Sequence, residues 1–237
     1  MRTFHPIAHG VLTASCLALA CAAAPELARA GTLDELSARD ATGGLRAALG
    51  QGIDQAVAHL GAPDGFLANP KVTIPLPAAL EKADRALRLV GMSGDADALK
   101  VAMNRAAEAA VAEATPVLKQ ALQRMTIEDA KDILTGGDDS ATAYFRRATT
   151  DSLTARFKPI VARETAKLKL ASLYDQYAGK AAEFGLVRSE DVHLNEYVTS
   201  KALDALFSEI GDEERAIRHD PLGQANSLIR RAFGAVH

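Results

Sequence analysis

Apolar residues recur at helical spacing along most of the chain. The stretch 32–60 carries five of them at steps of three or four: Leu45, Leu49, Ile53, Val57 and Leu60. This spacing places the five side chains on one face of an α-helix, where they can pack against a core. Similar spacing predicts further helices over residues 78–90, 95–125, 126–134, 168–184, 194–218 and 224–233, and two shorter ones between residues 138 and 159.

Capping and breaking residues predict several helix boundaries. Thr126 followed by Asp129 resembles a capping box, in which each residue's side chain bonds the other's backbone N–H. Pro116 lies inside the 95–125 stretch, where it should kink the helix or start a new one. The buried positions expected in this stretch are Val101, Val111, Val117, Leu118 and Leu122.

The stretch 130–159 holds the densest polar chemistry of the chain. Gly136 suits a left-handed helix end, and Asp138 or Asp139 suits the first position of the following helix. Another helix is predicted to begin near residue 150. Pro159 should interrupt it, because proline lacks the backbone N–H that a helix interior requires.

Residues 61–77 form the one long irregular stretch. Four prolines forbid a continuous helix here, yet the apolar residues are too many for a solvated linker. We expect a strap laid across the helices, with residues 72–74 extended; a functional loop is the alternative. The fold predicted from these patterns is all-α, a single multi-helix, bundle-like domain with one long proline-rich strap.

The first thirty residues have the pattern of a cleaved secretory signal. An apolar run follows Arg2, and Ala28 and Ala30 provide a small-x-small cleavage site before Gly31. The predicted organisation is therefore a signal peptide over 1–30 and one helical domain over 31–237. Two alternatives remain open, an uncleaved membrane anchor and a lipoprotein acylated at Cys21.

Composition changes this picture in two ways. Cys16 and Cys21 are the two cysteines of the chain, so the mature protein would have no disulfide. Loss of residues 1–30 would move the net charge from −3 to −4, which argues against a general nucleic-acid binder. No stretch of the mature chain is apolar enough to be a transmembrane segment. The predicted location is periplasmic or secreted.

Several segments together resemble a known family. They read DATGGLRAALGQGIDQAVAHLG, DGFLANPKVTIPLP, MNRAAEAA, ILTGGDDSATAYFR and LNEYVTSKALDALFSEIGDEERAIRHDP, and they extend from about Leu36 to the C-terminus. The chain is similar to an exported bacterial family classed as a domain of unknown function, family 4197. The resemblance implies a largely helical envelope protein with a signal peptide or lipoprotein signal, and it implies no activity.

Two polar groups are candidate ligand-binding sites. Asn104 and Glu108 lie one helical turn apart, beside Arg105, and a surface pair or a helix-crossing hydrogen bond is the simpler interpretation. The TGGDD turn (135–139) offers carboxylates that suit a divalent cation, although a plain helix junction also explains it. No other cofactor is expected. The second group comprises Asp132, Asp138, Asp139, Tyr144 and Arg146.

The zone 146–169 is strongly basic. It could contact anionic lipid, or it could be a solvated face paired with the acidic residues 212–214. The sequence shows no G-x-S-x-G, H-E-x-x-H, P-loop or dinucleotide-binding signature. We therefore expect a periplasmic or envelope protein that binds an envelope partner or a small ligand. The alternative is an enzyme or a metal- or ligand-binding protein centred on the TGGDD turn.

Overall fold

The computed structural model describes residues 24–89, 94–183 and 193–220. The predicted helix at 224–233, Cys21 and most of the predicted signal peptide lie outside these ranges. The chain divides into two units, residues 1–38 and residues 39–237. In the first unit the structure describes the beginning of one helix.

The described part of the chain is all-α, as predicted, and contains no strand. Its core is one continuous cluster of buried apolar side chains. The helices are α1 (Ala24–Gly61), α2 (Ala78–Leu89), α3 (Gly94–Val111), α4 (Thr115–Arg124), α5 (Ile127–Thr135), α6 (Ser140–Lys167), α7 (Leu170–Glu183) and α8 (Leu194–His219).

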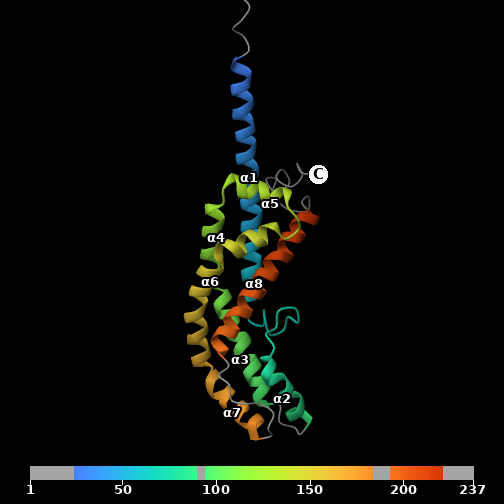
Figure 1. Ribbon diagram of the computed structural model, residues 1–237, viewed down its shortest axis with the longest axis vertical. Helices are drawn as coiled ribbons and strands as arrows, with labels where there is room; N and C mark the ends of the chain where they lie inside the picture. Colours follow the sequence, from blue (N-terminus) through green and yellow to red (C-terminus); the bar gives the residue numbers. More distant parts are fainter. Residues whose placement is uncertain (1–23, 90–93, 184–192, 221–237) are drawn as a thin grey trace, which may run out of the picture. The chain divides into compact units, whose positions relative to one another are not determined.

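Helix α3 is the element on which the second unit is assembled. It packs against α6, α7 and α8, while α6 and α8 also pack against each other. Alanines such as Ala102, Ala106 and Ala110 are buried on α3, and their small side chains allow neighbouring helices to approach closely. Helices α4 and α5 lie at one end of this unit and α2 and α7 at the other (Figure 1).

The apolar face predicted for the first helix is confirmed. All five of its residues, from Leu45 to Leu60, are buried. Two glycines allow α1 to approach other segments: a Cβ added at Gly52 would lie 3.3 Å from Glu213 Cβ, and one added at Gly61 would lie 3.2 Å from Ala112 Cα. These two glycines therefore serve packing.

The strap is an irregular cover for the core. Three of its own side chains, Phe66, Ile74 and Leu76, are buried. The prediction that residues 72–74 are extended is wrong in part, since the backbone N–H groups of Val72 and Thr73 both donate to Asn69 O, at 3.2 and 2.9 Å. This segment therefore makes a turn before it reaches Ile74.

Pro116 starts a new helix, as one of the two predicted outcomes required. Helix α3 ends at Val111, and Pro116 lies in the first turn of α4, where its missing N–H costs nothing. The burial predicted for Val101 is wrong, because its side chain is 40% exposed. The buried face of α3 passes through Leu99, Ala102 and Met103 instead.

The predicted break within residues 150–159 is wrong, because α6 runs unbroken from Ser140 to Lys167 with Pro159 inside it. Thr149 and Thr150 do not start a helix; their hydroxyls donate to the carbonyls four residues earlier, at 2.7 and 2.6 Å. Pro159 is exposed, so water can reach the carbonyl that its missing N–H leaves free. The buried side chains of Phe157 and Ile160 hold the helix on the opposite side.

The basic zone finds partners other than residues 212–214. Arg156 pairs with Glu113 at 2.9 Å. Arg163 and Lys167 both pair with Glu164, at 3.0 Å each. The predicted pairing with the acidic cluster is wrong, and contact with anionic lipid stays a prediction.

Candidate functional site

Asn104 fastens the strap to α3. Its side chain is fully buried. The amide oxygen accepts a hydrogen bond from Ile74 N–H at 2.8 Å, and the amide nitrogen donates to Ile74 O at 3.1 Å and to Lys100 O at 2.8 Å. Asn104 thus satisfies both backbone groups of a buried strap residue, which is neither the surface pair nor the helix-crossing hydrogen bond that was expected.

Glu108 and Arg105 hold the beginning of the strap. Glu108 is 5% exposed, and its carboxylate accepts from the N–H groups of Phe66 and Leu67 at 3.2 and 3.4 Å. Arg105 donates to Glu108 at 2.8 Å and to Asp64, a residue with a positive φ of 67°, at 2.6 Å. Hydrogen bonds to both acids raise the pKa of Arg105. These contacts place all three α3 residues in the strap's attachment to the core.

The TGGDD turn is tied to the end of α8. Asp139 is the N-cap residue directly before α6 but makes no capping bond with its side chain, and it pairs with Arg215 instead. Asp138 lies 3.9 Å from His219 Nε2. Gly136 has φ −82° and ψ 179°, so the predicted left-handed helix end is wrong. The capping box predicted at Thr126 and Asp129 is confirmed.

Glu214 performs the capping that the sequence suggested for Asp138 or Asp139. Its buried carboxylate accepts from the backbone N–H groups of Ala141 and Thr142 at 2.9 and 2.8 Å, and from the Thr142 hydroxyl at 2.8 Å. Arg218 donates to the same carboxylate at 2.9 Å and to Ile133 O at 2.7 Å. Glu214 belongs to an acidic run that sequence analysis treated as surface charge, and only its position in the helical spacing of α8 could have indicated burial.

The other candidate residues point in different directions. Tyr144 is buried and donates to Ala121 O at 2.9 Å; burial, helped by the charge of Asp129, raises its pKa. The Arg146 guanidinium lies 4.6 Å from the centre of the Phe207 ring. Asp132 is exposed. The structure therefore brings Asn104, Arg105 and Glu108 together, and it does not bring them to the residues of the TGGDD turn.

No group of three or more His, Cys, Asp or Glu side chains is placed to hold a metal ion within the described residues. At the TGGDD turn both aspartates lie beside basic side chains: Asp139 pairs with Arg215, and Asp138 lies 3.9 Å from His219 Nε2. Arg215 already satisfies the charge of Asp139, and its own pKa is raised by its hydrogen bond to Asp212 and by the charge of Asp139.

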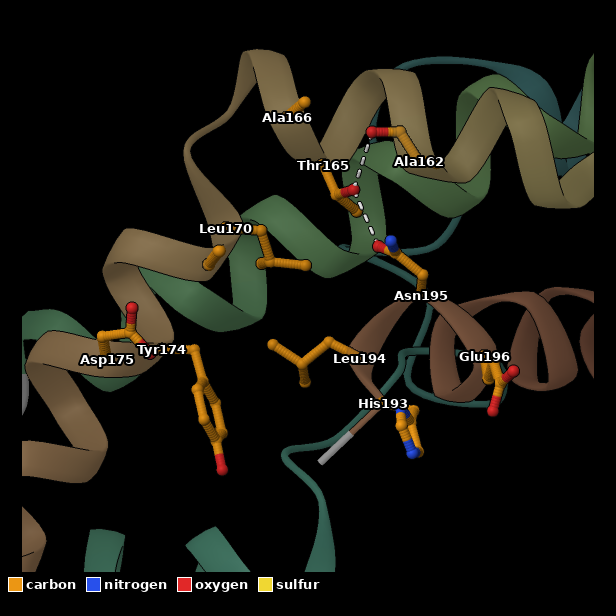
Figure 2. A pocket seen from close by; sticks show the side chains of 11 residues that line it. Ala162, Thr165, Ala166, Leu170, Tyr174, Asp175, His193, Leu194, Asn195 and Glu196 are labelled. Carbon is orange, nitrogen blue, oxygen red and sulfur yellow. Dashed lines mark hydrogen bonds between the residues drawn. The ribbon is translucent and has the colours of Figure 1, made fainter. Parts of the chain in front are cut away.

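A cavity of about 560 Å³ lies where three helix ends meet, at the end of α6, the start of α7 and the start of α8. Lys169, with a positive φ of 53°, makes the sharp connection between α6 and α7. The apolar lining of the cavity consists of Leu170 and Leu194, which are buried, together with small side chains (Figure 2). Those small side chains are Ala162, Ala166 and Ala171.

Polar side chains line the same cavity from all three helices. The Thr165 hydroxyl of α6 donates to Asn195 Oδ1 of α8 at 2.8 Å, which joins the two helices beside the cavity (Figure 2). Tyr174 and Asp175 come from α7, and His193 and Glu196 from the start of α8. Sequence analysis found none of these residues, because the helix ends that carry them share no motif and no local spacing.

Comparison with known proteins identifies a family but no activity or ligand. No curated protein and no solved structure matches the chain. The model of one family, described as a protein of unknown function (DUF4197), matches residues 35–234. That span covers the strap, both of its attachments and the cavity, so the chain belongs to the DUF4197 family of proteins of unknown function.

Proposed function

We propose that this is an exported protein of the cell envelope that acts by binding a small ligand rather than by catalysis. We place the binding site in the cavity between α6, α7 and α8. The observation that carries the proposal is the cavity's lining, in which an apolar surface is combined with a few polar groups from three separate helices. Ligand sites in proteins have this composition and fall in this range of volumes.

Two observations favour binding over catalysis. The Thr165 hydroxyl at the cavity donates to an amide oxygen and to Ala162 O at 3.1 Å, so no general base activates it as a nucleophile. The alternative site at the TGGDD turn has less support, because Asp139 pairs with Arg215 and the Glu214 carboxylate already accepts hydrogen bonds from the first turn of α6.

The proposed location in the cell envelope rests on residues 1–30, which resemble a signal peptide. Within the described residues, no helix combines the length and apolar character needed to cross a membrane.

The test is ligand retention by the native protein. The protein is purified from the periplasm and examined by native mass spectrometry, as wild type and as Ala166→Leu, which fills part of the cavity. Ala155→Leu is the matched control, since Ala155 is an exposed alanine of the same helix outside the cavity. We expect a small molecule to be bound to wild type and A155L but not to A166L. Equal retention by A166L, or no bound molecule in any of the three, would contradict the proposal.

A further inference from the structure

Among the described residues, the charged groups that line the cavity are of one sign. Asp175 of α7 and Glu196 of α8 contribute two carboxylates, and the described part of the lining contains no lysine or arginine. His193, neutral in the formal count, is the one basic side chain among these described residues. A cavity lined in this way attracts cations and repels anions.

Two basic residues near the end of α6 already have another acidic partner. Lys167 and Arg163, at the end of α6, are both held by Glu164 at 3.0 Å. No ion pair joins Asp175 or Glu196 to a basic side chain within the described residues. Both carboxylates are therefore available to a ligand.

One feature opposes this preference. Helices α7 and α8 both begin at the cavity, where each N-terminus carries the equivalent of roughly half a positive charge, and α6 ends there with roughly half a negative charge. The partial positive charge that remains would favour an anion if it acted alone. Two full carboxylates outweigh it, so the balance of charge at the cavity is negative.

The remaining lining suits an apolar body. Leu170 and Leu194 are 2% and 8% exposed, and both line the cavity together with the Tyr174 ring (Figure 2). Aliphatic carbons can pack on the leucines. An aromatic ring face can also attract a cation that lies over it.

We infer that the cavity selects small ligands in which a protonated amine is attached to an apolar body. The inference rests on the cavity being a binding site, as proposed above, and adds the chemical class of the ligand. Asp175 and Glu196 lie on opposite sides of the cavity (Figure 2), and the carboxylate of either one can receive the ammonium group, while Leu170, Leu194 and the Tyr174 ring receive the apolar part.

Three probes with the same apolar body separate charge from shape: hexylamine, hexanol and hexanoate. Each is titrated into the protein as it is purified from the periplasm, and binding is followed by the NMR shifts of backbone amides near the cavity. We expect hexylamine to bind about fivefold more tightly than hexanol, the effect of one favourable charge contact near the surface. Hexanoate should bind most weakly, and added salt should reduce the preference for the amine.

Neutral variants test the two carboxylates. Asp175→Asn and Glu196→Gln should each reduce the preference for hexylamine over hexanol while leaving hexanol binding unchanged. Asp151→Asn is the control, because it removes the same charge from an exposed position of α6 away from the cavity. A double variant that keeps the wild-type preference, or equal wild-type affinities for amine and alcohol, would overturn the inference and leave the binding site standing. If no probe shifts the amides at the cavity, the proposed binding site fails as well.

Discussion

Buried polar side chains in this protein bind backbone groups of distant segments. Asn104 satisfies both backbone groups of Ile74, and Glu108 satisfies two N–H groups of the strap. A buried donor or acceptor without a partner costs about 1–3 kcal/mol, so these side chains determine where the strap can lie. Asn104 and Glu108 were expected from the sequence as candidate ligand-binding residues. The sequence could not identify their partners, because residues 66–74 lie thirty or more positions away.

Gly136 and Gly137 differ in the space around them, and their alanine variants should differ accordingly. A Cβ added at Gly136 would collide with the Ser140 hydroxyl and lie 2.7 Å from Asp132 O, whereas one added at Gly137 meets nothing within 4 Å. We expect Gly136→Ala to lower the free energy of unfolding by about 1–3 kcal/mol, the usual cost of overpacking. Gly137→Ala should change it by less than about 0.5 kcal/mol. Urea denaturation measures both, and equal effects would contradict the steric explanation.

Two neighbouring acids on α8 should affect stability in opposite directions. Burial raises the pKa of Glu213, and the charge of Glu209 adds to this against the opposing effect of His59. The pKa of Asp212 also experiences burial, but hydrogen bonds from Lys71 and Arg215 outweigh it and lower the pKa below its ordinary value. An acid with a raised folded-state pKa destabilises the folded protein at neutral pH, and this cost disappears as pH falls through that pKa.

Glu213→Gln should therefore raise Tm at pH 7 and give no gain near about pH 4, where the wild-type side chain is largely protonated. Asp212→Asn should lower Tm at pH 7, because a lowered pKa contributes stability above the unfolded-state value of 3.8 that is lost only at more acidic pH. Thermal melts of both variants at the two pH values provide the measurement. A lower Tm for E213Q at pH 7 would refute the cost assigned to its carboxylate.

At the scale of elements, tertiary contacts decide what local signals leave open. Periodicity predicted the buried face of α1 because it depends only on neighbours within two turns. Local signals failed at Pro159 and near residue 150, where packing of Phe157 and Ile160 carries α6 through a helix-breaking residue. The prediction of the residue that caps α6 was wrong for the same reason, because the capping side chain, Glu214, belongs to a helix more than seventy residues away.

Replacing Glu214 should damage α6 far more than replacing Asp139. Glu214→Ala leaves two buried N–H groups and the largely buried Arg218 without their carboxylate, which should cost about 3–5 kcal/mol. Asp139→Ala removes an exposed ion pair worth less than about 1 kcal/mol. Glu214→Gln, which keeps hydrogen-bond acceptance without the charge, should lie between them. Urea denaturation gives the order, and a larger loss for D139A would return the capping role to Asp139.

At the scale of the whole molecule, the sequence predicted an all-α fold and its core but not the cavity. The cavity is formed by residues 162–175 and 193–196, whose side chains meet only after three helices have packed. Its polar residues, His193 and Glu196 among them, are of types that are common on protein surfaces, and their neighbours in the sequence do not distinguish them. Asn104, which the sequence did single out, is fully buried. A buried polar side chain that bonds the backbone has a structural role, which differs from lining a ligand site.

The last prediction concerns what the cell exports. Ala28 and Ala30 carry the small side chains that a signal peptidase requires, so the exported protein should begin at Gly31. N-terminal sequencing and the intact mass of the periplasmic protein measure this directly. Because Cys16 and Cys21 both precede the cleavage site, the mature protein should also show the same Tm with and without reductant. A mature species that begins at an acylated Cys21 would instead establish a lipoprotein, and a species that retains residues 1–30 would establish an uncleaved anchor.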